Sequence, residues 1–181
     1  MSRDAARTVN AAVATERSER FLDGVTGKAI AIAAFAALTA IGARLSVPLP
    51  GTAVPMTLQP VAVLLAGLVL GSRAGAASQV LYLAAGAAGL PVFAAGGGVA
   101  YLLGPTGGYL LAFPVAAAVA GLGARRGPGI ASLWLIAALA LIHAGGLSWL
   151  WITGGRALVE AVGVKPFLVG DLLKVALVLA V

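Results

Sequence analysis

Apolar residues gather along this chain into six long runs, which are separated by short stretches rich in glycine, proline and charged residues. The runs extend over Lys28–Leu45, Thr57–Leu70, Ala74–Leu90, Pro105–Leu122, Ile130–Ile152 and Pro166–Val181. A helix that crosses a bilayer perpendicular to its plane needs about 20 residues, so the second and sixth runs are short for a span. The pattern predicts an all-α integral membrane protein, with a bundle of six transmembrane helices over residues 27–181.

Residues 1–26 form a strongly polar segment ahead of these runs. It mixes basic and acidic side chains: Arg3, Arg7, Arg17, Arg20, Asp4, Glu16, Glu19 and Asp23. The acidic residues and the many later spans argue against a cleaved signal peptide. We interpret the segment as a cytoplasmic N-terminal tail.

The composition agrees with a bilayer environment, because 61% of the residues are hydrophobic and only 10% are charged. Soluble domains carry about 25% charged residues, so this chain has too few to cover a surface that faces water. Its 25 glycines fit the same setting, since small residues let helices approach closely in a membrane. The absence of cysteine excludes disulfides, thiolate catalysis and cysteine-ligated metals.

The basic residues give the orientation. A net charge of +6 would suggest a nucleic-acid partner in a soluble protein, but here the basic residues lie mostly between apolar runs, where they set topology. With the tail inside, eight lie on inner segments: Arg3, Arg7, Arg17, Arg20, Lys28, Arg73, Arg125 and Arg126. Three lie on outer segments, Arg44, Arg156 and Lys165, and Lys174 is left in the membrane. This excess predicts that both termini are cytoplasmic and that the chain does not bind nucleic acid.

The connections between runs differ in length on the two sides. The inner ones, at residues 71–75 and 124–129, are tight, whereas Ser46–Met56, Pro91–Gly104 and Thr153–Lys165 on the outer side are long. Long ordered loops are often lids or binding loops. All three long loops fall on one side, so we expect a pocket that opens outward.

Two charges inside the last apolar run, Asp171 and Lys174, are the strongest candidate binding residues. Their three-residue spacing puts both on one helical face. A charge in the membrane interior costs at least a few kcal/mol, so the pair should face the bundle interior or a cavity. A structural ion pair, or a lysine that reaches the interface, is the alternative explanation. Their place near the outer end of the helix, below the long loops, favours ligand binding.

Neutral polar residues offer a second candidate group. Thr57 and Gln59 stand at the head of an apolar run, where they could contact a ligand or, alternatively, cap the helix and face solvent. The glycines at 96–98, and those between 104 and 108, permit a close approach of backbone N–H groups to a ligand anion. Neither stretch has the lysine and hydroxyl residue of a phosphate-binding loop.

Residues suited to catalysis are scarce. His143 is the only histidine, so a metal cluster or a histidine-containing triad is hard to assemble; we interpret it as an interhelical hydrogen-bonding residue. Trp149 is expected at a helix end or in a pocket wall. We therefore predict that the chain is not an enzyme and uses no cofactor.

Together these stretches resemble the BioY family, the biotin-specific substrate-binding (S) components of energy-coupling-factor (ECF) transporters. The match runs in order from about residue 30 to the C-terminus, through Val54-Pro55-Met56-Thr57-Leu58-Gln59, Gly71-Ser72-Arg73-Ala74-Gly75-Ala76, Gly89-Leu90-Pro91-Val92-Phe93, Leu103-Gly104-Pro105-Thr106-Gly107-Gly108-Tyr109 and Gly170-Asp171-Leu172-Leu173-Lys174. Each stretch is weak alone, and their combination and order are specific. The polar tail lies outside the match.

The resemblance implies a six-helix S-component bundle in the bacterial cytoplasmic (inner) membrane, with one high-affinity biotin site near the outer face. It implies a transmembrane coupling (T) subunit and ABC-type ATPase subunits as partners. It assigns Asp171 and Lys174 to biotin, and it places the small residues Ala33, Ala37 and Ala40 of the first helix against the coupling subunit. The alanines could equally serve packing inside the bundle.

Biotin fits the candidate residues chemically. Asp171 and Lys174 would meet its ureido group, with Gln59 and Thr57 as neutral partners, while Tyr82, Phe93 and Trp149 would pack its rings and Gly97 would lie in the binding loop. Another possibility is a self-sufficient ion-coupled transporter of a small metabolite, with Asp171 as a proton site. Such folds typically show internal repeats and further intramembrane carboxylates, which this sequence lacks.

Overall fold

The computed structural model describes residues 24–47, 54–162 and 165–180. Its helices are α2 (Val25–Arg44), α3 (Gln59–Ala87), α4 (Val99–Leu102), α5 (Gly107–Ala120), the 3-10 turn η1 (Gly121–Gly123), α6 (Pro128–Val162) and α7 (Lys165–Leu179). Two short antiparallel strands, β1 (Ser46–Val47) and β2 (Met56–Thr57), precede α3. The mainly helical fold confirms the predicted class, and most of the predicted tail lies outside the described residues.

Helix α3 is a hairpin of two helical arms that meet at Gly71. Gly71 has φ 80° and ψ 171°, a non-helical conformation that only glycine adopts readily. A Cβ added to Gly75 would lie 2.8 Å from Gly67 Cα, so the two arms are in close contact just beyond the turn. The Nε2 of Gln59 donates to the hydroxyl of Tyr82 at 2.6 Å, although 23 residues of continuous helix would extend about 35 Å. The predicted second and third helices are therefore antiparallel neighbours.

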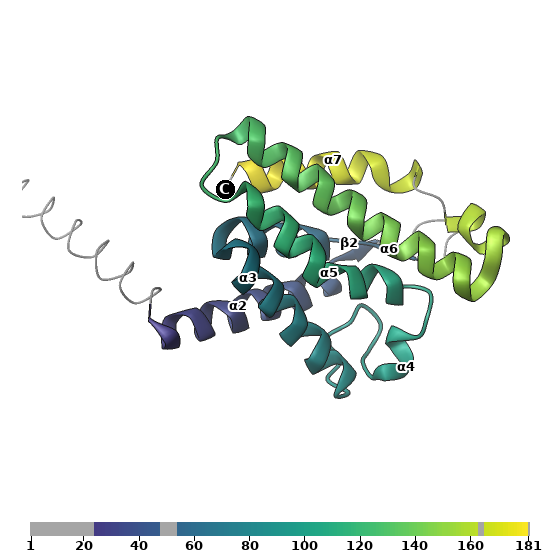
Figure 1. Cartoon of the computed structure of the whole chain (residues 1–181). Coiled ribbons are helices and arrows are strands. Elements are labelled where there is room, and N and C mark those ends of the chain that lie inside the picture. Colours follow the sequence, from purple (N-terminus) through teal and green to yellow (C-terminus); the bar gives the residue numbers. More distant parts are fainter. Residues whose placement is uncertain (1–23, 48–53, 163–164, 181) are drawn as a thin grey trace, which may run out of the picture.

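The remaining helices pack around this hairpin (Figure 1). A Cβ on Gly67 would collide with the carbonyl oxygen of Ala117, so α5 approaches α3 at backbone distance. Helix α6 lies along α5, and α7 follows α6 so that the C-terminus returns to the end where α6 begins (Figure 1). Helix α4 and the last turns of α6 lie at the opposite end (Figure 1).

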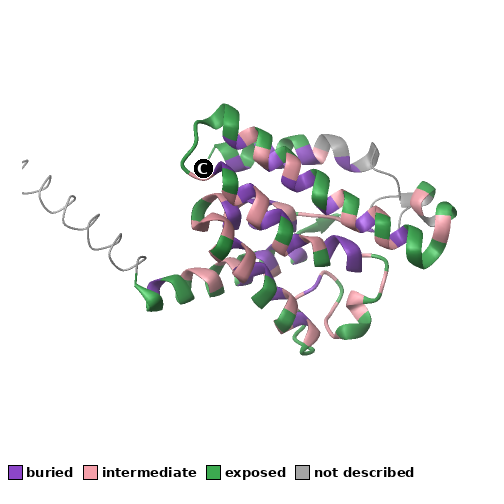
Figure 2. Ribbon diagram, in the orientation of Figure 1, coloured by how far each residue is buried: buried purple, intermediate pink, exposed green. Residues whose placement is uncertain are grey.

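The outer surface of the bundle is strongly apolar. Within the described part of the chain, three helices are long and apolar enough to cross a membrane, namely α2, α3 and residues Pro128–Ala157 of α6, and Gly107–Gly123 is a shorter apolar helix. Large apolar side chains such as Val69, Leu133 and Leu172 are exposed on the surface rather than packed in the core (Figure 2). Apolar patches of this extent would be costly in water, so the protein is membrane-embedded.

Two of the predicted loops differ from the structure. We expected a loop over Thr153–Lys165, but α6 continues to Val162 and is interrupted only at Gly155, with φ 66° and ψ −165°. Thr153 and the glycines after it suggested a loop, yet only one of these residues leaves the helical conformation. The loop predicted over Ser46–Met56 begins and ends in the β1–β2 ribbon, and residues 48–53 of this loop lie outside the described part.

Helix α2 contacts α3 through one polar position. The buried Thr39 accepts a hydrogen bond from Gln79 Nε2 at 3.2 Å and donates to the carbonyl oxygen of Phe35 at 2.9 Å. The predicted partner-facing alanines share one face of α2 but differ in exposure: Ala33 and Ala37 are exposed, whereas Ala40 is half-buried and packs against the core. Contact of these alanines with another subunit stays a prediction.

Candidate functional site

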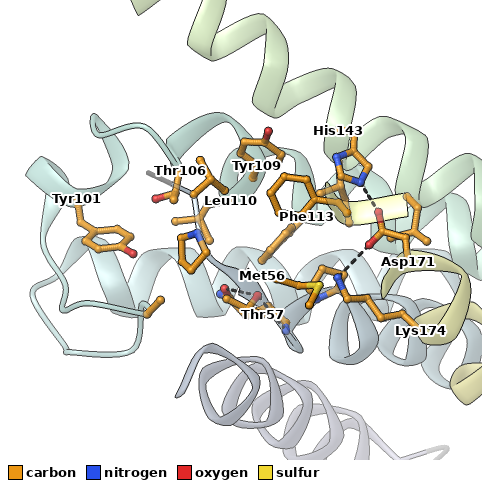
Figure 3. A pocket seen from close by; sticks show the side chains of 18 residues that line it. Met56, Thr57, Tyr101, Thr106, Tyr109, Leu110, Phe113, His143, Asp171 and Lys174 are labelled. Atoms are coloured by element: carbon orange, nitrogen blue, oxygen red, sulfur yellow. Dashed lines mark hydrogen bonds and ion pairs between the residues drawn. The ribbon is translucent and has the colours of Figure 1, made fainter. Parts of the chain in front are cut away.

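A cavity opens among β2, the start of α3, α5, α6 and α7 (Figure 3). It holds about 610 Å³ of space between atoms, a volume that includes space open to solvent. Its lining includes Val54, Pro55 and Met56 from the first predicted outer loop, and Ala94 and Tyr101 from the second. Two of the three long loops therefore contribute to one pocket, as expected.

Asp171 and Lys174 lie together in the wall of this cavity on α7. Lys174 Nζ donates to Asp171 Oδ1 at 2.9 Å, and the other carboxylate oxygen, Oδ2, lies 2.5 Å from Nε2 of His143 on α6 (Figure 3). Asp171 is 8% exposed and Lys174 6% exposed. The predicted shared face is confirmed, and so is the prediction that His143 forms an interhelical hydrogen bond.

Thr57 and Gln59 also line the cavity, from β2 and the start of α3. The Thr57 hydroxyl donates to Gln59 Oε1 at 3.1 Å and accepts from the Gln59 backbone N–H at 3.3 Å. Gln59 is buried, so the alternative in which it faces solvent is wrong, whereas Thr57 does bond the backbone at the start of α3. The Tyr82 hydroxyl accepts a hydrogen bond from the Gln59 amide and donates to the carbonyl oxygen of Val92 at 3.3 Å.

The predicted aromatic residues Tyr82 and Phe93 form a layer behind the cavity wall. Both are fully buried, and their rings meet edge-on with centroids 5.5 Å apart. Tyr82 stacks on Phe113 at 6.4 Å and Phe93 stacks on Tyr101 at 5.1 Å. Phe113 and Tyr101 belong to the cavity lining, so Tyr82 and Phe93 support two of its rings.

Gly97 and Trp149 also lie outside the lining. A Cβ on Gly97 would collide with the carbonyl oxygen of Leu90, so Gly97 packs against the end of the α3 hairpin. Trp149 donates through Nε1 to the carbonyl oxygen of Gly104 at 3.0 Å, which fixes the entry to α5. Direct contact of either residue with a ligand stays a prediction.

Several lining residues were missed by reasoning from the sequence. They are mostly aromatic or carry one polar group: Tyr101, Thr106, Tyr109, Phe113, His143 and Phe167. Thr106 and Tyr109 belong to the glycine-rich stretch, for which we predicted a ligand contact by the backbone N–H groups and not by the side chains. His143 had a detectable signal, as a histidine within an apolar run. Phe113 had none, because an apolar residue in a membrane helix can face lipid or core equally well.

The cavity suits binding of a compact, mostly apolar ligand with a few polar groups. Aromatic and aliphatic walls surround an anion, a cation and a neutral hydroxyl–amide pair. Among the described residues, no group of three or more histidine, aspartate, glutamate or cysteine side chains could hold a metal ion. The arrangement therefore favours recognition through hydrogen bonds and shape.

Comparison with known proteins first defines the class. The fold matches the crystal structure of the S-component for biotin from an ECF-type ABC transporter, with a TM-score of 0.77 and 25% sequence identity over 84% of this chain and 87% of that one. The bundle is therefore an S-component fold.

The sequence comparisons then give the family. The BioY family model matches residues 10–181, and the chain belongs to the BioY family. It is 42% identical over 146 residues to a probable biotin transporter BioY of Pyrococcus horikoshii, covering 80% of this chain and 87% of the relative. It is 40% identical over 146 residues to the biotin transporter BioY of Thermotoga maritima, covering 77% and 84%.

Proposed function

We propose that this chain is the biotin-capture subunit of an ECF-type importer, and that biotin binds in the cavity beside Asp171 and Lys174. The observation that carries the proposal is this buried pair, which lies in the wall of a cavity lined by aromatic and polar side chains in a member of the BioY family. Burying a charge pair has a desolvation cost that only good geometry and further hydrogen bonds offset. Charged residues inside a membrane segment are therefore candidates for a functional site.

Biotin matches the cavity group by group. Its ureido ring offers two N–H donors and one carbonyl acceptor, which Asp171 and Lys174 complement. Its fused rings are apolar and fit against Phe113 and Tyr101, while the Thr57–Gln59 pair offers further neutral hydrogen bonds. A site of this kind rejects analogues that lack one polar group, because the protein partner would then be buried without a hydrogen bond.

The proposed topology has six transmembrane segments, with both termini in the cytoplasm of a bacterial cell and the cavity toward the outside. The two arms of α3, which turn at Gly71, support six segments. The basic residues Arg73, Arg125 and Arg126 are exposed near the tight connections and support the orientation. Helix α4 and the β1–β2 ribbon, whose residues Met56 and Thr57 line the cavity, belong to the proposed outer side.

Delivery of biotin across the membrane needs partners in this proposal: a transmembrane coupling subunit and ABC-type ATPase subunits. The chain offers a helix surface for the first of them, because Ala33 and Ala37 lie exposed on α2 one turn apart. Small residues at this spacing allow a partner helix to approach closely.

Uptake of radiolabelled biotin tests this function. We expect cells that produce the chain with its coupling and ATPase subunits to accumulate biotin, and we expect a catalytically inactive ATPase to abolish the accumulation. Accumulation by the chain alone that collapses with the proton gradient would instead support the ion-coupled transporter. If biotin is neither accumulated nor retained by cells with the full set of subunits or by cells with the chain alone, the proposal is contradicted.

A further inference from the structure

His143 links the two helices that frame the charged wall of the cavity. Its Nε2 lies 2.5 Å from Asp171 Oδ2, and its ring packs 5.7 Å from the ring of Phe167 on α7. An ionised carboxylate can only accept hydrogen bonds, so Nε2 must carry the proton. The other ring nitrogen, Nδ1, is buried and has no hydrogen-bond partner among the described residues.

We propose that His143 is a positioning residue for ligand binding: it fixes the Asp171 carboxylate so that this group and the Lys174 ammonium meet the ligand in one set geometry. The inference rests on the proposed function, since it concerns the same cavity. His143 acts through Asp171, and it need not itself touch the ligand.

The charges of the three side chains fit this role. Asp171 and Lys174 cancel each other, so a neutral His143 leaves the buried group without net charge. A protonated His143 would add a positive charge to a low-dielectric site and leave an Nδ1–H without an acceptor. The hydrogen bond to Asp171 therefore places a proton on Nε2 of His143.

Preorganisation explains why the site needs a third group. Asp171 and Lys174 are on the same helix, so their mutual contact does not fix where α7 places them relative to the rest of the cavity. The hydrogen bond from His143 on α6 fixes the position of the Asp171 carboxylate relative to the rest of the cavity. A group held in its bound geometry before binding loses less freedom when the ligand arrives, and affinity rises accordingly.

A pair of amide variants tests the role. In Gln, Nε2 lies four bonds from Cα, as in His, whereas the Asn Nδ2 lies only three bonds away, so His143→Gln can reach Asp171 and His143→Asn cannot. We expect His143→Asn and His143→Leu to weaken biotin binding by about 5- to 150-fold, the equivalent of leaving one buried acceptor unpaired. His143→Gln should recover most of this loss. The matched control is Thr39→Val, which removes an interhelical hydrogen bond away from the cavity and should lower thermal stability without changing biotin affinity.

Because His143 is the only histidine, ¹⁵N-histidine labelling gives an NMR signal from this one ring. We expect a proton on Nε2, both in the free protein and with biotin. A proton on Nδ1 alone would overturn the inference, and this readout needs no variant to fold. Equal affinities for the Gln and Asn variants would also overturn it. Absence of biotin binding by the wild-type protein would instead overturn the proposed function.

Discussion

Removing both charges of the α7 pair separates a ligand contact from a structural ion pair. Asp171→Asn alone would leave the Lys174 ammonium, 6% exposed, without its anion, and breaking a buried pair in this way costs about 3–5 kcal/mol of stability. Weak binding by that variant could then reflect poor folding. The double variant Asp171→Asn with Lys174→Met avoids this problem, because it is neutral and keeps the side-chain volumes close to the original.

The structure sets the expected size of the effect. In the double variant, the amide oxygen that replaces one oxygen of the Asp171 carboxylate can still accept from His143 Nε2, so the interhelical hydrogen bond is retained. The ligand loses hydrogen bonds to charged groups, each worth about 1.5–3 kcal/mol. We therefore expect biotin affinity to fall by about 10- to 150-fold for each hydrogen bond lost, while the protein stays folded.

The assay is equilibrium competition against labelled biotin, with the purified protein in lipid nanodiscs and thermal unfolding measured in parallel. Arg156 and Glu160 supply the control, since they pair at 2.7 Å on α6 with side chains 79% and 62% exposed. Changing both to Gln should leave biotin affinity unchanged and stability within about 1 kcal/mol. If the Asp171/Lys174 double variant binds biotin within about threefold of wild type, the pair is structural and the reasoning is refuted.

Three further predictions concern topology, assembly and cavity shape. In this cysteine-free chain, Gly127→Cys should resist an impermeant thiol reagent in intact cells while Thr153→Cys reacts; the reverse labelling would invert the proposed orientation. Ala37→Trp should abolish co-purification with the coupling subunit and spare biotin binding, because position 37 is exposed; loss of binding with intact assembly would place this alanine in the binding core. Gly170→Ala would put a Cβ 2.6 Å from Met56 Sδ, so this flexible side chain in the cavity wall has to shift; we expect weaker biotin binding with recovery on adding Met56→Ala, and an unchanged affinity would show that the position of Met56 does not matter for binding.

The sequence was most informative where a residue type conflicts with its surroundings. Asp171 and Lys174 stand out because charges are expensive in an apolar helix, and the structure places both at the cavity. The short break between apolar runs at residues 71–75 predicted a tight connection, and the structure places the turn at Gly71, which has a positive φ. The apolar runs predicted the helices, and conflicts of this kind predicted the charged wall of the site.

Residues that match their surroundings gave no such signal. Phe113 and Phe167 lie in apolar helices, and an apolar pattern does not distinguish the side facing lipid from the side facing the cavity. Tyr82 and Phe93 were predicted as ring contacts but form the layer behind Phe113 and Tyr101. The order of such layers depends on tertiary packing, which spacing along the chain does not encode.

Calorimetric titration of the purified wild-type protein with biotin tests the central claim most directly. We expect one saturable site per chain, with an affinity that falls by about 10- to 150-fold when Asp171→Asn is combined with Lys174→Met. Absence of saturable binding by a folded wild-type protein, or a second equivalent site that persists in the double variant, would contradict a single biotin site beside the α7 pair.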